Sequence, residues 1–146
     1  MAVVSFSNNW KLILDALEGV LEGEFKGALP VYKGNSIPAG VNQALQLIPT
    51  NSVLSGYNIS SETREFSIQL RFIFNEANVN ETALDHILRQ VSRIEALIHD
   101  NVAMALSDSS DAFNCRFEST ELNADEESGI YVVLWEYKCQ HLGNVE

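Results

Sequence analysis

An alternating segment from Thr63 to Phe74 constrains the fold of this chain more than any other stretch. In TREFSIQLRFIF, apolar side chains occupy every second position, and polar ones stand between them up to Ile73. A period of two residues places alternate side chains on opposite faces of a β-strand. The apolar set is Phe66, Ile68, Leu70, Phe72 and Phe74, and the polar set is Glu65, Ser67, Gln69 and Arg71. The segment therefore predicts a strand with one buried face and one face open to water or a partner.

The first candidate cover for the buried face is an amphipathic helix predicted over residues 8–23. Ser7 or Asn8 is the expected N-cap, and Gly23 is the expected end. The opposite, polar face is acidic, which disfavours a membrane-surface helix and favours a cover for the sheet. The apolar stripe follows the i, i+3, i+4 rule and consists of Trp10, Ile13, Leu14, Leu17, Val20 and Leu21.

A second amphipathic helix is predicted directly after the alternating strand. It begins near Asn80 or Thr82 and continues to about Val102, which makes it the longest expected element. Its apolar positions are Leu84, Ile87, Leu88, Val91, Ile94, Leu97 and Ile98. Both helices can therefore cover the same face of the sheet.

The region between the first helix and the alternating strand predicts short strands and a long loop. Residues 28–33 contain Pro30, which suits an edge strand because proline has no N–H to donate. The loop over residues 34–43 carries Ile37 and Val41, which either dock onto a neighbouring protein or fold back onto their own domain.

After that loop, the pattern is weaker. Leu45 and Leu47 predict another short strand that Pro49 ends. Residues 53–60 are ambiguous and are interpreted as the first arm of a hairpin leading into the alternating strand.

A closing hairpin is predicted from strands 113–122 and 129–141, joined by the acidic turn NADEESG. Phe113, Cys115 and Phe117 alternate with polar residues on the first strand. On the second strand, one face carries Tyr131, Val133, Trp135, Tyr137 and Cys139. The other face begins with Ile130, Val132 and Leu134, which implies burial on both sides, within the fold or against another subunit.

Length and composition predict one α+β domain over residues 1–146, with a mainly antiparallel sheet and two helices packed on one face. The formal charge of −11 and only nine Lys and Arg residues argue against a general nucleic-acid binder. The chain has no apolar run long enough for a membrane helix and no basic leader typical of a signal peptide. We therefore expect production in the cytoplasm.

The two cysteines, Cys115 and Cys139, are too few for a disulfide framework. Buried free thiols are the favoured interpretation, and a disulfide across the hairpin remains the alternative because the strand register is not known from sequence.

No catalytic, cofactor-binding or metal-binding pattern is present in the sequence. The three histidines, His86, His99 and His141, do not have the spacing of metal ligands. The acidic run at residues 125–127 lacks EF-hand spacing and is interpreted as a solvated turn. We expect no enzyme activity, no cofactor and no metal.

The order of elements resembles the tail terminator, or tail-completion, proteins of long-tailed bacteriophages. The resemblance consists of the helix over residues 8–22, the strand and loop over 28–43, TREFSIQLRFIF, the helix over 82–102, and the closing hairpin that ends in YVVLWEYKC. It implies a virion protein of the phage neck, assembled in the host cytoplasm. Related neck and tail-tube proteins share much of this build.

The resemblance further implies a homo-oligomeric ring, usually of six subunits. One side of the ring meets the tail-tube protein, and the other meets the head-completion proteins. DNA then passes through the channel without specific binding, and some of the 20 acidic residues are hypothesised to line that channel.

Contact residues are expected around the long loop, on the polar side of the alternating strand and at the hairpin tip. The candidates are Lys33, Ile37, Val41, Arg64, Arg71, Glu126 and Glu127.

A small-ligand-binding α+β domain is the rival interpretation. Its pocket would be lined by Tyr131, Trp135 and Tyr137. Aromatic residues that alternate along a strand are more often part of a core than of a pocket.

Overall fold

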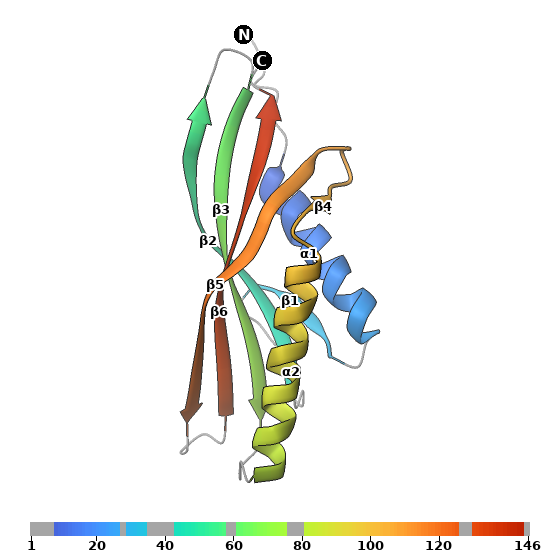
Figure 1. The fold of residues 1–146 in the computed structure, drawn as a ribbon, viewed down its shortest axis with the longest axis vertical. Coiled ribbons are helices and arrows are strands. Elements are labelled where there is room, and N and C mark those ends of the chain that lie inside the picture. The colour runs from blue at the N-terminus through green and yellow to red at the C-terminus, as the bar shows by residue number, and fades with distance from the viewer. Residues whose placement is uncertain are drawn as a thin grey trace.

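The computed structural model describes residues 8–26, 29–34, 43–57, 61–75, 81–125 and 130–144. Its fold is α+β, as predicted: a strongly twisted six-stranded sheet with both helices on one side (Figure 1). Every neighbouring pair of strands is antiparallel except β1 and β2, and the strand order is β1-β2-β3-β6-β5-β4. The elements are α1 (Asn9–Phe25), β1 (Val31–Lys33), β2 (Gln43–Tyr57), β3 (Ser61–Asn75), α2 (Glu81–Asp100), β4 (Met104–Ala105), β5 (Asp111–Asp125) and β6 (Ile130–Asn144).

The alternating segment forms β3, a central strand, which confirms the prediction. It pairs with β6 along its whole length without a break in register and with β2 on its other side. Phe66, Ile68, Leu70 and Phe72 are buried under the helices, and Phe74 at the strand end is partly buried. The apolar side of β3 is therefore the floor of the core.

Helix α1 begins where the sequence indicates and ends later. The side chain of Asn8 caps it by accepting the backbone N–H of Lys11 at 3.1 Å. The expected end at Gly23 is wrong, because the helix continues to Phe25 and the left-handed residue Lys26 follows it. Phe25 is buried in the core, and the guanidinium of Arg93 lies 4.7 Å from its ring centroid. Burial of this aromatic side chain favours the two additional helical residues past Gly23.

Helix α2 packs beside α1 on the same face of the sheet. Its buried stripe is Ile87, Val91, Ile94 and Ile98. The ion pair between Arg93 and Glu24, at 2.8 Å, joins the two helices on their solvent side. Helix α2 ends at Asp100, before the expected Val102, whose side chain is exposed.

Strand β2 is much longer than the sequence predicts. Pro49 does not end it, because β1 pairs only with Leu45–Leu47 and leaves the outer edge of β2 free at the proline. Proline is tolerated where no ladder hydrogen bond is required. The edge position of β1 itself is confirmed. Of the predicted loop, residues 35–42 lie outside the described residues.

Two β-bulges interrupt the alternation of β2, at Thr50 and at Ser55. The Thr50 hydroxyl donates to the carbonyl of Ser67, and the Ser55 hydroxyl donates to that of Thr63, both at 3.0 Å. Each bulge adds one residue and exchanges the two faces of the strand beyond it. This is why residues 53–57, which belong to the ambiguous region, show no simple period although they form a strand.

The closing hairpin of β5 and β6 is confirmed, with one correction. Phe113 does not share a face with Cys115 and Phe117, because an irregularity between Phe113 and Arg116 includes Asn114 at a φ of 53°. Phe113 is consequently exposed, whereas Cys115 and Cys139 are buried as free thiols, the favoured interpretation from sequence.

His141 is a buried titratable group at the upper end of the core. Its Nε2 atom lies 3.0 Å from the Ser110 hydroxyl, and its ring meets the edge of Phe66. Burial lowers the pKa of His141 below its usual 6.5, although the nearby charges of Asp108 and Glu62 oppose this shift. The folded state therefore favours neutral His141.

The first prediction concerns the floor of the core. Replacing Ile68, which is fully buried, with alanine should lower the free energy of unfolding by about 2–5 kcal/mol, because the substitution removes buried methyl groups and leaves a cavity. Urea unfolding measures this change. The matched control, Val53→Ala at an exposed position of β2, should change stability by less than about 0.5 kcal/mol. Equal losses in the two variants would contradict the placement of β3.

The second prediction concerns pH. Because the unfolded chain binds a proton at His141 more readily than the folded chain, stability should fall as pH decreases through about 6.5. His141→Gln should flatten the dependence of unfolding free energy between about pH 7.5 and about pH 5.5. His99→Gln, at an exposed residue in the last turn of α2, should leave the wild-type slope in place. An unchanged slope in the His141 variant would contradict the assignment.

Candidate assembly interface

The face of the sheet opposite the helices, called the open face below, is not covered by α1 or α2 (Figure 1). It is mostly half-buried or exposed, in contrast to the helix-covered face. The register of the ladders places polar, charged and aliphatic side chains there together. Its residues include Ile48, Ser67, Gln69, Arg71, Ile73, Arg116, Ser119, Glu121, Val132, Leu134, Glu136 and Lys138.

A ladder of ion pairs crosses three strands of the open face. Arg116 on β5 pairs with Glu65 on β3 at 3.2 Å, spanning the intervening β6. Lys138 on β6 lies 3.7 Å from the same carboxylate and 3.4 Å from Glu136. Arg116 also pairs with Glu118 at 3.0 Å. Cations and anions therefore neutralise one another within the subunit, and sequence reasoning missed this network because its members are far apart in the chain.

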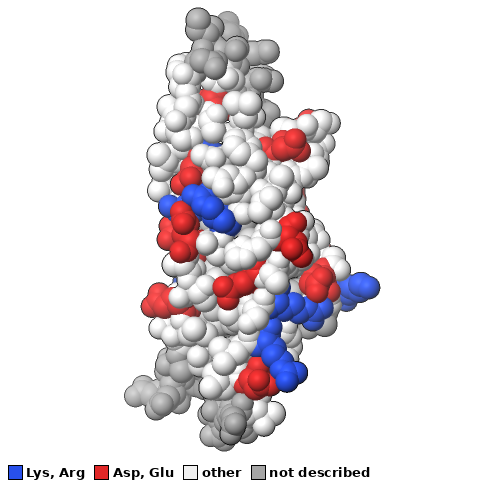
Figure 2. All heavy atoms as spheres, in the orientation of Figure 1, with Lys and Arg blue, Asp and Glu red and all other residues white. Residues whose placement is uncertain are grey.

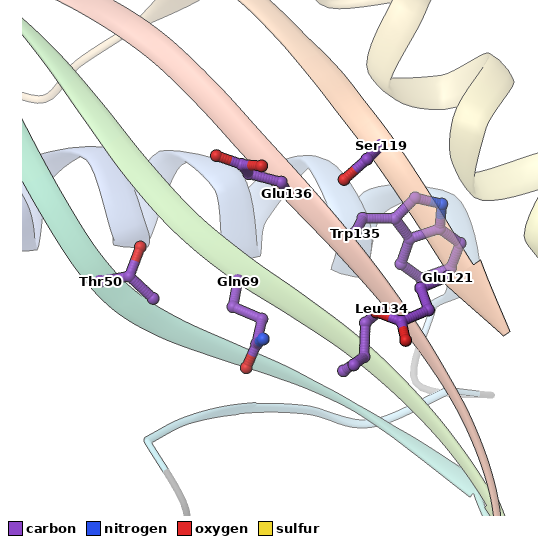
Figure 3. Close-up of a pocket in the computed structure, with 7 residues that line it drawn as sticks. All are labelled: Thr50, Gln69, Ser119, Glu121, Leu134, Trp135 and Glu136. Carbon is purple, nitrogen blue, oxygen red and sulfur yellow. The ribbon is translucent and has the colours of Figure 1, made fainter. Parts of the chain in front are cut away.

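Beside this network, the open face is hollowed (Figure 3). The hollow has a volume of about 290 Å³, and its lining residues come from four adjacent strands. It contains two carboxylates, and among the described residues Glu121 makes no ion pair. The lining residues are Thr50, Gln69, Ser119, Glu121, Leu134, Trp135 and Glu136. Such a mixed, shallow surface is suited to contact with another protein.

Of the predicted contact residues, Arg71 lies on the open face. Its Nε donates to Gln69 Oε1 at 3.0 Å, and it has no carboxylate partner among the described residues. Arg64 does not lie on that side. The unbroken register of β3 gives Arg64 the parity of Phe66, so it belongs to the helix-covered face, where it pairs with Glu62 at 3.2 Å. The prediction that both arginines share the polar side is wrong for Arg64.

Lys33 makes contacts within the subunit. Its ammonium lies 2.7 Å from the carboxylate of Asp15 and 3.8 Å from that of Glu18, so it ties β1 to α1. The hydrogen bond from Lys33, with a second from Lys11, lowers the pKa of Asp15, and the same contact raises the pKa of Lys33. The other candidates, Ile37, Val41, Glu126 and Glu127, lie outside the described residues.

A set of exposed apolar side chains at the upper end of the sheet was not predicted from sequence. Val53, Leu54 and Tyr57 on β2 and Leu142 on β6 are exposed by 53%, 45%, 67% and 54%. Here β2, β3 and β6 extend beyond α1 (Figure 1), and Figure 2 shows few charged side chains at this end. The register places Leu54 and Tyr57 on the helix-covered face and Val53 and Leu142 on the open face. We call these four residues, which lie at the same end of the sheet, the distal patch. The only signal in the sequence was a run of uncharged residues, because the bulges conceal the strand period.

Neither a metal site nor a membrane span is found in the part of the chain that the structure describes. No group of three His, Cys, Asp or Glu side chains there is arranged to hold an ion. Neither α1 nor α2 has the length and apolarity needed to cross a membrane.

Comparison with known proteins identifies the fold. No protein-family model and no curated protein sequence matches the chain. A chain from the solved virion of a native gene transfer agent particle is similar in structure, with a TM-score of 0.62 over 90% of this chain and 98% of that chain. This protein shares its fold with a virion component. The sequence identity is 11%, so the likeness concerns the fold alone.

A second solved protein, whose name states no function, gives a TM-score of 0.63 at 15% identity. The match covers 96% of this chain and 99% of that one. Each comparison therefore spans almost the whole of both chains.

The third prediction concerns the ion-pair ladder. Glu65→Gln should lower the free energy of unfolding by about 1 kcal/mol, with a smaller loss at high salt, because Arg116 and Lys138 lose their shared carboxylate. Chemical unfolding at two salt concentrations measures both effects. Glu121→Gln, on the same face without an ion pair, is the control and should have little effect. Equal losses in the two variants would show that the ladder is not stabilising.

Proposed function

We propose that this protein is a structural virion protein of a bacteriophage neck. In this role it forms a ring that terminates the tail tube and joins it to the head-completion proteins. The observation that carries the proposal is the full-length fold likeness to a component of the gene transfer agent virion. The order of helices and strands that resembles tail terminators supports the same role.

The surfaces of the subunit suit assembly into a ring. Rings form when two different surfaces of each subunit meet head to tail and the rotation closes. This subunit has a helix-free sheet face with aliphatic and charged side chains, and a separate apolar patch at one end of the sheet. It therefore offers more than one surface to its neighbours.

The acidic balance of the chain suits a passage for DNA. The formal charge of −11 gives a ring of many subunits a large negative charge, which repels phosphate and opposes adhesion of the DNA. On the described part of the open face, acidic and basic side chains largely pair with one another. We propose that the excess acids outside this network supply the repulsion.

The aromatic side chains of β6 favour this structural role over the rival ligand-binding role. Trp135 is buried and stacks on Phe117 at a centroid distance of 5.3 Å, and Tyr137 is buried beside them. Tyr131 is packed against the same core. These aromatic rings fill the core, as aromatic residues that alternate along a strand usually do.

The fourth prediction tests the ring. Sedimentation and native mass measurements at high concentration, or after incubation with purified tail tubes, should show a closed oligomer. The resemblance to tail terminators implies six subunits as the usual number. Negative-stain images should show single rings or rings capping tube ends. Open tubes built from this protein alone would instead indicate a tail-tube role. A monomer under all conditions, with no binding to tubes, would contradict the proposal.

A further inference from the structure

Strand β2 is the one long strand of the sheet without a charged side chain. Its sequence, QALQLIPTNSVLSGY, contains no Asp, Glu, Lys or Arg, although 20% of the whole chain is charged. Copies of a chain with a net charge of −11 repel each other, so contact between them is least unfavourable where both surfaces lack acids. The charge pattern thus marks β2 as the strand best suited to meet another copy.

Among the described residues, no strand pairs with most of the outer edge of β2. Strand β1 pairs only with Leu45–Leu47, so residues 48–57 have no described strand on that side. The bulges at Thr50 and Ser55 make this edge irregular, which opposes a continuous strand-to-strand ladder. A partner at this edge would be bound chiefly through the exposed side chains of the distal patch, led by Leu54 and Tyr57.

A second set of exposed apolar side chains lies toward the opposite end of the sheet, on its helix-covered side. Leu84 and Leu88, one turn apart on α2, are exposed by 37% and 43%. Leu122 on β5 is exposed by 44% and is in register with buried Val133, so it belongs to the same face. We call Leu84, Leu88 and Leu122 the α2 patch.

The two helical residues of the α2 patch, Leu84 and Leu88, lie on the side of α2 that faces away from α1. His86 occupies the other flank, where it contacts Gln43 of β2 and the ring of Phe74 on β3. Because β6 and β5 follow β3 in the sheet, Leu84 and Leu88 lean toward the β5 edge. One molecule therefore has an apolar patch on its β2 edge and a different one near its β5 edge, at opposite ends of the strands.

We infer that the distal patch of one copy packs against the α2 patch of the next copy. This inference rests on the proposed ring. The two surfaces are different, lie on opposite edges of the sheet and centre on exposed apolar side chains, which a head-to-tail contact between identical subunits can bury. Leu54 and Tyr57 share the helix-covered face of the sheet with Leu122, because their strand partners Arg64 and Glu62 have the parity of Phe66. Side-by-side subunits can therefore bring these residues together on one side.

Paired variants test this contact. One chain carries Leu54→Ser with Tyr57→Ser, and the other carries Leu88→Ser with Leu122→Ser. All four side chains are exposed, so each variant should keep the wild-type circular dichroism spectrum and unfolding temperature. The control is Val102→Ser, at an apolar residue exposed by 57% outside both patches. Oligomeric state is measured by sedimentation velocity and negative-stain imaging.

Each double variant alone should lose the ring, and the control should keep it. A mixture of the two double variants retains one intact distal patch and one intact α2 patch, on different chains. The mixture should therefore form dimers of one chain of each kind, and no rings.

The other outcomes separate this inference from the proposed function. If wild-type protein forms a ring and either double variant keeps it, the patch pairing is overturned and the ring stands. If both variants lose the ring but their mixture stays monomeric, the distal patch does not meet the α2 patch. If wild-type protein forms no ring with or without tail tubes, the proposed function and this inference fail together.

Discussion

The uninterrupted pairing of β3 with β6 is the interaction on which the rest of this structure depends. It runs from Ser61–Asn75 of β3 along Ile130–Asn144 of β6 without a bulge. Since side chains in a strand alternate with a period of two, an unbroken register assigns every residue of both strands to one face. The apolar face then receives α1 and α2, and the other face carries the ion-pair ladder.

The strands on either side of this central pair are irregular. Both β2 and β5 contain two breaks in register, and each is flanked by a short strand that covers only a few of its residues. Bulges redirect side chains and disturb the edge of a sheet. The first bulge of β2 brings Leu54 to the helix-covered face, and the second returns Tyr57 to the face of Leu45 and Leu47. The irregularity of β5 leaves Phe113 on the open face. The regular centre supplies stability, and the irregular flanks supply the exposed apolar groups that the proposed ring would use.

The charged side chains also limit how copies of the subunit can meet. Most basic side chains pair with acids of the same chain, as Lys33 does with Asp15 and Arg116 with Glu65. The acidic excess then gives copies of the subunit a mutual repulsion that any assembly must overcome. In the proposed ring, the uncharged β2 and the two patches of exposed apolar side chains would meet that requirement by burying apolar area.

The sequence by itself determined the elements whose pattern is local: β3, both helices and the closing hairpin follow from periods of 2.0 and 3.6 residues. It also indicated Asn8 as a cap and favoured free cysteines. Tertiary structure decided what depends on distant neighbours. Burial of Phe25 extended α1 past Gly23, the short β1 left Pro49 on a free edge, and the bulges of β2 and β5 reassigned faces. These outcomes depend on which helix or strand packs against each segment. A local sequence period carries no information about those neighbours.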